Sequence, residues 1–122
     1  MGCCSEGKAK ICVLTLEDTP AEELHGGGVV RRIITRAGTG MDITFSKALL
    51  KPGAGHSWHD HPTQDEAVFI LKGEGTMSIE GYGDVQYKPG MAIVMPRGVK
   101  HQNKNTSKED SELVSMFTPA LR

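Results

Sequence analysis

Glycine and proline divide this chain into short segments, and their spacing limits the folds that the chain can adopt. Turn-forming groups such as Pro52-Gly53, Pro89-Gly90 and Pro96-Arg97-Gly98 separate stretches that are apolar or that alternate between apolar and polar residues. These stretches are 29–35, 41–50, 67–71, 76–80, 91–95 and 113–117. Short runs at roughly ten-residue spacing are typical of an antiparallel sandwich or barrel. The sequence therefore predicts an all-β fold.

Two of the predicted strands, within 68–71 and 92–95, carry apolar side chains at every position. Successive side chains of a strand point to opposite faces, so both faces of these strands are expected to be covered. One face would fill the interior. The other would lie under a second sheet, under the N-terminal segment or against a partner chain.

Residues 1–28 precede the first predicted strand and are expected to form an N-terminal arm. Within this arm, residues 19–24 are a candidate short helix. Thr19 is suited to cap it and Pro20 to occupy its first position. Glu22 and Glu23 would face the positive end of the helix, which favours carboxylates.

Charge and hydropathy exclude several classes of partner. The 122 residues carry a formal net charge of −1, which gives no electrostatic reason to expect a nucleic acid or an anionic membrane as partner. No apolar run approaches the ~20 residues of a membrane span, and no hydrophobic secretory signal is present, so a cytoplasmic protein is expected. An odd number of cysteines without such a signal argues against a disulfide framework: Cys3, Cys4 and Cys12.

Three of the five histidines lie in the segment GAGHSWHDHPTQDE, residues 53–66. In a strand, His59 and His61 share one face and Asp60 lies on the other, so the two imidazoles can bind one metal ion. His56 has the opposite parity to His59, and we expect it not to be a ligand.

Glu66 follows Pro62, which would break a central strand, so residues 62–65 are expected to turn the chain back as a hairpin. Glu66 would then face the same interior as the two histidines. A carboxylate there is either a metal ligand or a costly buried charge. Asp65 has the other parity and is expected to be solvated.

The fourth ligand is expected from one of the two remaining histidines. His101 follows a Pro-Arg-Gly turn and precedes two asparagines at alternate positions, whereas His25 lies in a glycine-rich loop. The candidate ligand set is therefore three nitrogens and one oxygen: His59, His61, Glu66 and His101.

The spacing of these residues within two longer patterns points to a family. From Gly53 the chain reads G-x5-H-x-H-x4-E-x6-G, ending at Gly73. From Gly90 it reads G-x5-P-x-G-x2-H-x3-N, ending at Asn105. Both segments resemble the two signature motifs of the cupin superfamily. One position departs from many relatives, which carry Asp where this chain has Met91.

The resemblance implies a double-stranded β-helix, the cupin jelly-roll barrel, formed by a single domain over residues 29–118. It also implies that a metal ion lies inside the barrel, held by His59, His61 and Glu66 of the first motif and by His101 of the second. Small cupins are commonly homodimers, so a second copy of the chain is the expected cover for strands that are apolar on both faces.

Three imidazoles and one carboxylate suit one divalent transition metal ion per chain. An ion that prefers six ligands would keep two positions open, which favours Fe, Mn or Ni, while Zn, Co and Cu are also compatible. The function implied is that of a mononuclear metalloenzyme acting on a small oxygenated molecule, either a dioxygenase or a non-redox isomerase, lyase or decarboxylase. The alternative is a non-catalytic module that binds or senses a small molecule through its metal.

Residues that would contact the small molecule are less clearly marked. The candidates near the metal are Phe45, Met77, Met95 and Phe117. Residues 41–46 alternate between an apolar and a polar face, and the sequence leaves open which of the two lines the interior. Three arginines are candidates for holding an anionic substrate, with a solvated edge as the alternative: Arg31, Arg32 and Arg36.

Overall fold

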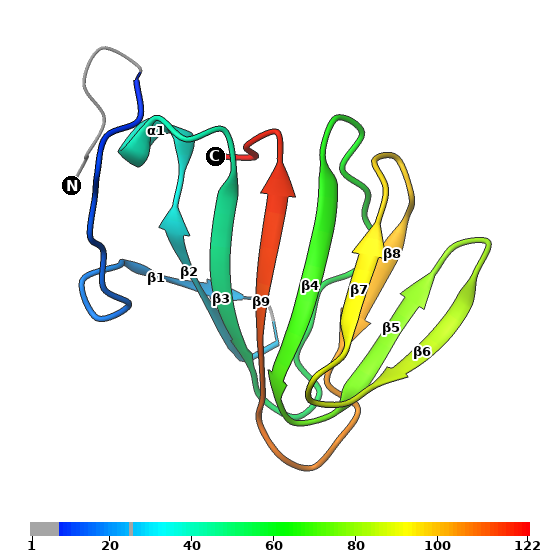
Figure 1. Cartoon of the computed structure of the whole chain (residues 1–122). Coiled ribbons are helices and arrows are strands. Elements are labelled where there is room, and N and C mark those ends of the chain that lie inside the picture. The colour runs from blue at the N-terminus through cyan, green and yellow to red at the C-terminus, as the bar shows by residue number, and fades with distance from the viewer. Residues whose placement is uncertain (1–7, 25) are drawn as a thin grey trace.

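The computed structural model describes residues 8–24 and 26–122, and nearly all of its regular structure is strand (Figure 1). Its elements, in chain order, are β1 (Ala21–Leu24), β2 (Gly28–Ile34), α1 (Arg36–Thr39), β3 (Thr44–Leu50), β4 (Asp65–Lys72), β5 (Gly75–Ile79), β6 (Gly83–Tyr87), β7 (Ala92–Met95), β8 (His101–Lys104) and β9 (Ser111–Thr118). The predicted all-β fold is confirmed.

The strands form two antiparallel sheets. A six-stranded sheet has the order β1-β2-β3-β9-β4-β7, and a three-stranded sheet has the order β6-β5-β8. The segment before β4 joins the two sheets, because it makes isolated bridges to β8 at Gly55–Lys104 and at His59–His101. The result is the predicted double-stranded β-helix, in which each sheet covers one side of a shared interior.

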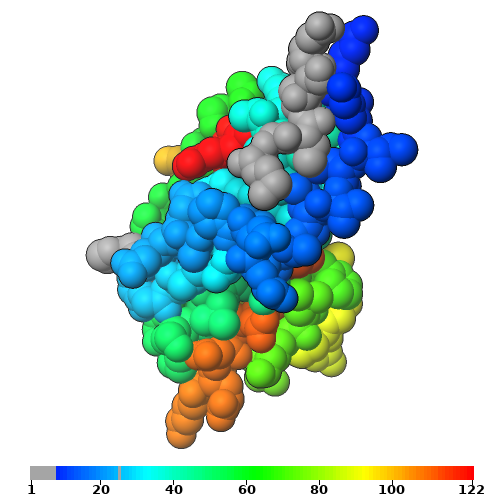
Figure 2. All heavy atoms as spheres, turned by 90° about the vertical axis from the view of Figure 1, so that its left-hand side faces the viewer, coloured from blue at the N-terminus to red at the C-terminus, as the bar shows by residue number. Residues whose placement is uncertain are grey.

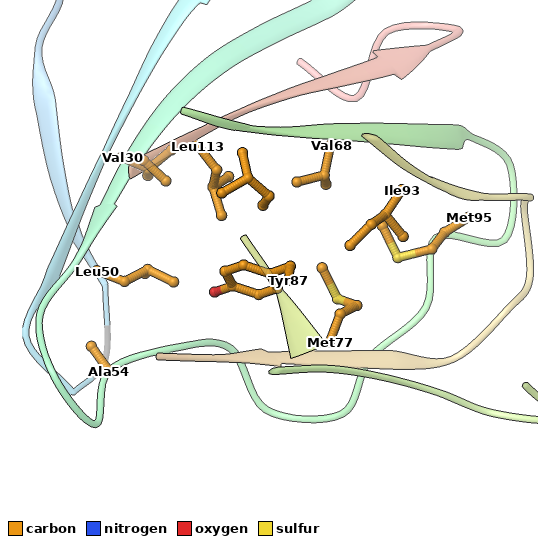
Figure 3. Packing of buried hydrophobic residues seen from close by; sticks show 11 residues of the cluster. Val30, Leu50, Ala54, Val68, Met77, Tyr87, Ile93, Met95 and Leu113 are labelled. Carbon is orange, nitrogen blue, oxygen red and sulfur yellow. The ribbon is translucent and has the colours of Figure 1, made fainter. Parts of the chain in front are cut away.

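The interior is filled by side chains that alternate along each strand. In β3, every second residue is buried, beginning at Thr44 and ending at Leu50. Figure 3 shows the apolar part of this core, in which Tyr87 and Met77 of the small sheet face Val68 and Leu113 of the large one. Because one face of each strand supplies this core, the register of the whole barrel is determined.

The candidate helix at 19–24 does not form. Residues 21–24 are instead strand β1, which pairs with β2 along its full length. Thr19 closes the turn before this strand, since its backbone N–H donates to the Leu16 carbonyl at 3.1 Å and its hydroxyl donates to the Thr15 carbonyl at 2.9 Å. Pairing with an available sheet edge outweighs local capping signals here.

The helix that does form, α1, is a single turn that was not predicted. Thr35 caps it, because its hydroxyl accepts a hydrogen bond from the Gly38 N–H at 2.9 Å. Gly40 ends it in the left-handed region at φ 79°, a conformation that glycine adopts without strain. No helix of the described residues is long and apolar enough to cross a membrane.

The described part of the N-terminal segment lies along the outside of the large sheet, where Figure 2 shows it in blue over this side of the molecule. The Arg31 guanidinium holds it there by donating to the Leu16 and Thr19 carbonyls at 3.3 and 2.5 Å. Cys12 is disulfide-bonded, although the odd number of cysteines argued against a disulfide framework. The other two cysteines, Cys3 and Cys4, lie outside the described residues, as does His25.

Candidate metal centre

The segment that carries two of the histidines is not a regular strand, contrary to the prediction. His59 makes a single bridge to His101, in which each backbone N–H donates to the other's carbonyl, at 3.0 and 2.9 Å. His61 follows in an irregular stretch before a turn at 62–63, and the Gly98 N–H donates to its carbonyl at 3.0 Å. Both signature segments are therefore tied together by their backbones at the site.

Glu66 comes from the opposite sheet. It lies near the start of β4, between Met95 of β7 and Phe117 of β9 in the register of the large sheet. The predicted turn after Pro62 does bring Glu66 back toward the histidines. The neighbouring Phe117 ring packs edge-on against His61, with ring centroids 4.8 Å apart, and so limits the movement of that imidazole.

The four predicted ligands converge. One potential ligand nitrogen from each of His59, His61 and His101 lies within 4.8 Å of the other two, so this group can hold a metal ion. Glu66 Oε1 lies 3.1 Å from His101 Nε2 and 3.7 Å from His61 Nε2. The His59 ring lies 4.4 Å from that of His101 and 5.0 Å from that of His61, measured between centroids.

Backbone carbonyls orient two of the imidazoles. The Nδ1 atom of His59 lies 2.7 Å from the Ser57 carbonyl oxygen, and that of His101 lies 3.0 Å from the Val99 carbonyl oxygen. Each Nδ1–H donates to its carbonyl, which leaves Nε2 as the nitrogen with a free electron pair. This arrangement presents a metal-binding nitrogen toward the centre and holds each ring in place.

The residues fit a bound metal ion. Glu66 Oε1 is buried and has no hydrogen-bond partner within the described residues, and its near neighbours are the Nε2 atoms of His61 and His101. A buried carboxylate without partners is costly, and a cation at its oxygen removes that cost. Two atoms about 2.1 Å from one ion lie about 3.0 Å apart at a right angle, or about 3.4 Å apart in a tetrahedron. The contacts of Glu66, 3.1 and 3.7 Å, lie around these separations.

The surroundings shift the histidine pKa values in opposite directions. Burial lowers the pKa of His61, and the adjacent Glu66 carboxylate only partly offsets this. Burial also acts to lower the pKa of His101, but the Glu66 carboxylate and the Val99 carbonyl outweigh it, so that the pKa is raised. The Glu66 carboxylate acts to raise the pKa of both imidazoles, but it outweighs burial only at His101.

A cavity of about 440 Å³ opens beside these four residues, which is within the usual range for small-molecule sites. Met77 and Phe117, two of the four candidate substrate contacts, line it. Phe45 does not, because the polar face of β3 points inward and carries Thr44 and Ser46, while Phe45 points outward. Met95 does not line it either, and packs in the apolar core shown in Figure 3.

From the sequence, His56 and Asp65 are excluded from the ligand set, and in the structure both lie outside the histidine group that could hold a metal ion. His56 lines the cavity, and its ring centroid lies 5.6 Å from that of His59, outside the cluster of three histidines. Burial lowers the pKa of His56.

Asp65 is not merely solvated, because Arg97 donates to it from its backbone N–H at 2.9 Å and from its guanidinium at 3.2 Å. This contact ties the start of β4 to the turn before His101.

The three candidate arginines lie in three different parts of the structure. Arg32 lines the cavity, whereas Arg31 binds the N-terminal segment and Arg36 pairs with Asp42 at the surface. Sequence reasoning left Ser46 undecided and missed Ser115 in the cavity wall. The alternation of residues 41–46 offered a signal for Ser46, but only the pairing of β3 with β9 decides which face is inside.

Comparison with known proteins agrees with this geometry. The chain is 27% identical over 110 residues to the protein SchB of Streptomyces halstedii, covering 88% of this chain and 77% of SchB. It is 32% identical over 73 residues to an oxalate-binding protein of Thermotoga maritima, covering 60% of each. It spans between 24% and 62% of the length of the curated relatives other than SchB.

A solved structure shares the fold. It is described as a predicted oxalate decarboxylase from Thermotoga maritima, and it superposes with a TM-score of 0.78 at 23% identity, covering 88% of this chain and 99% of the other. Residues 47–117 match the family model described as the cupin domain, and they include all four converging residues. Because that match covers more than half of the chain, the chain belongs to the cupin family.

Proposed function

We propose that this protein is a mononuclear metalloenzyme that acts on a small oxygenated molecule. The observation that carries the proposal is Glu66 Oε1, which is buried without a hydrogen-bond partner in the described structure and faces three imidazoles. His59, His61, Glu66 and His101 would hold one divalent transition metal ion. A bound ion of this kind supplies Lewis-acid polarisation of a substrate oxygen, or redox chemistry if it is iron, manganese or nickel.

The chain's own residues provide the surroundings that this chemistry requires. Phe117 and Val68 form apolar walls next to the ligands and exclude water from one side of the cavity. The carbonyls of Ser57 and Val99 hold the rings of His59 and His101, so that neither ring has to reorganise when substrate binds.

The reaction is either a dioxygenation or a non-redox isomerisation, elimination or decarboxylation. Among the described side chains that line the cavity, Glu66 is the only carboxylate, and His56 is the only imidazole outside the ligand set. With few groups left for acid–base catalysis, metal-centred chemistry is favoured. An ion that prefers six ligands would have positions left for substrate, so Fe, Mn or Ni is the proposed metal.

The alternative is a module that binds or senses a small molecule through its metal without turning it over. The scarcity of acid–base groups favours this alternative as well, and one relative is named for binding oxalate rather than for a reaction. Tight binding of a ligand that is recovered unchanged would support the alternative.

The proposal is tested first by the metal content of the purified protein and then by turnover with and without oxygen. A substrate consumed equally fast under both conditions would exclude the dioxygenase and leave the non-redox reactions. A purified protein that takes up no transition metal would overturn the proposal altogether.

We also propose that the protein is a homodimer. The outer face of the large sheet carries apolar side chains on three adjacent strands, β7, β4 and β9. The most exposed of them are Val94 at 68%, Leu71 at 45%, Phe69 at 43% and Met116 at 38%. The register places Phe69 beside Ala92 and Val114 in one continuous row. A contiguous apolar surface of this kind is typical of an interface between chains.

A further inference from the structure

One wall of the cavity carries polar groups where a small barrel would ordinarily be filled by apolar side chains. In the register of the large sheet, Arg32 of β2 lies beside Ser46 of β3, and Ser46 lies beside Ser115 of β9. All three line the cavity. They form a row across the inner face, which we name the polar row.

The polar row lies next to the row that holds Glu66. Ser115 and Phe117 point inward two residues apart on β9, and Phe117 lies beside Glu66. The two rows are therefore separated by about 7 Å along the strands. Across the sheet, three strand spacings, about 14 Å, separate β2 from β4. The side chains of Arg32 and Glu66 both extend into this span, which leaves room for a molecule of a few carbon atoms.

The hydroxyl in the middle of the row is left without a partner. Ser46 is 2% exposed, and its hydroxyl makes no hydrogen bond with any residue in 8–24 or 26–122. Because Ser46 lines the cavity and its hydroxyl makes no bond within the described structure, this hydroxyl is available to a polar ligand there.

Glu22 holds the guanidinium of Arg32 in place, but several N–H donors of Arg32 have no partner among the described residues. Its side chain is 20% exposed, and its Nη1 atom donates to Glu22 Oε2 of β1. A guanidinium has five N–H donors, so the edge formed by Nε and Nη2 is available to a second anion. Glu22 acts here as a positioning residue. Paired donors of this kind match the two oxygens of a carboxylate.

We infer that the ligand is a small molecule with two anionic groups, one at the metal centre and a carboxylate at Arg32. The hydroxyls of Ser46 and Ser115 would donate to the oxygens of that carboxylate. The inference rests on the proposed metal centre for the first contact and adds the substrate class, a short dicarboxylate. A neutral molecule would leave the free edge of Arg32 unpaired in a partly buried site.

The test compares diacids with their monoamides, which have the same size and one charge fewer. Binding of malonate, succinate and glutarate, and of malonamate, succinamate and glutaramate, is measured by isothermal titration calorimetry on the purified protein with its retained metal. We expect at least one diacid to bind about ten-fold or more tightly than its monoamide, because charge-assisted pairing with Arg32 is lost in the amide. Equal affinity within every pair would overturn the inference.

Substitutions then test whether Arg32 causes the preference for diacids over monoamides. Arg32→Gln is expected to bring the ratio of the two affinities below about three-fold, whereas Arg36→Gln, which breaks a surface ion pair away from the cavity, is expected to leave it unchanged. A preference that persists in Arg32→Gln would also overturn the inference. If that variant does not fold, Arg32→Lys decides, because it keeps the charge but loses the paired donors and should lower the ratio.

Metal analysis of the same samples separates the two proposals. A protein that retains metal but does not prefer diacids contradicts the inference alone. A protein that retains no metal contradicts the proposed function, on which the inference rests.

Discussion

Glu66 Oε1 lies 3.1 Å from Nε2 of His101, although the two residues belong to different sheets. The small sheet supplies His101 and, through the bridge beside it, His59. The large sheet supplies Glu66 from β4. The site is therefore assembled only when the two sheets close on each other, and a bound cation would link them at this point.

Glu66→Gln is expected to reduce metal affinity by more than about ten-fold, because an amide oxygen is a weaker ligand than a carboxylate. Elemental analysis of the purified variant and of the wild-type protein measures this loss.

The matched control for Glu66→Gln is His56→Ala, which alters another cavity residue that lies outside the three-histidine cluster. It should retain the wild-type metal content. Full metal occupancy in the Glu66 variant would show that the carboxylate is not a ligand. Loss of metal in the His56 variant would show that the ligand set is larger than proposed.

Much of the fold could be predicted because its signals are local. Turns at glycine and proline divide the chain into strands whatever their partners are, and the turn at Pro62 returns Glu66 toward the histidines. The predictions that were wrong failed because they depend on pairing with segments that local signals do not reveal. Residues 21–24 have good helix-start signals, but they become β1 because the edge of β2 is available for pairing.

The cavity walls could not be predicted for the same reason. Residues 41–46 alternate cleanly, yet only the pairing of β3 with β2 and β9 decides that Ser46 faces inward and Phe45 outward. Met95 and Met77 are both inward and almost fully buried, but Met77 alone reaches the cavity. Alternation indicates the face of a residue and not its depth along the barrel.

Tyr87→Phe should lower the free energy of unfolding by about 1–3 kcal/mol, because it leaves a buried acceptor unpaired. The Tyr87 hydroxyl donates to Asn103 Oδ1 at 2.8 Å in the buried interior. Tyr82→Phe is the control, because Tyr82 is 78% exposed. Urea unfolding of both variants measures the difference, and equal stability of the two would contradict the structural role of this hydrogen bond.

The ion pair between Lys47 and Glu112 should make stability depend on pH. Lys47 Nζ lies 2.5 Å from Glu112 Oε1, and this hydrogen bond lowers the pKa of Glu112. A depressed carboxyl pKa stabilises the fold above the unfolded value of about 4.5, and that contribution is lost as the pH falls through the folded value. Because the pair is partly exposed, we expect a coupling of only about 0.2–1 kcal/mol.

A double-mutant cycle of Lys47→Met and Glu112→Gln, followed by urea unfolding at pH 7 and at pH 3, measures this coupling. The coupling should be present at pH 7 and smaller at pH 3, because the stabilisation from a depressed carboxyl pKa is lost as the pH falls below the unfolded value. A coupling of the same size at both values would mean that the charge of Glu112 contributes nothing.

Val94→Glu should convert the proposed homodimer into a monomer. Val94 is 68% exposed in the outer apolar face and lies beside Ala67 on β4, so a charge there would be buried without a partner in the interface. Ile11→Glu, at a residue 101% exposed in the N-terminal segment, is the control for added charge alone. Size-exclusion chromatography with light scattering gives the mass of each protein. A wild-type mass of one chain would contradict the homodimer, and a dimeric Val94 variant would move the interface away from this face.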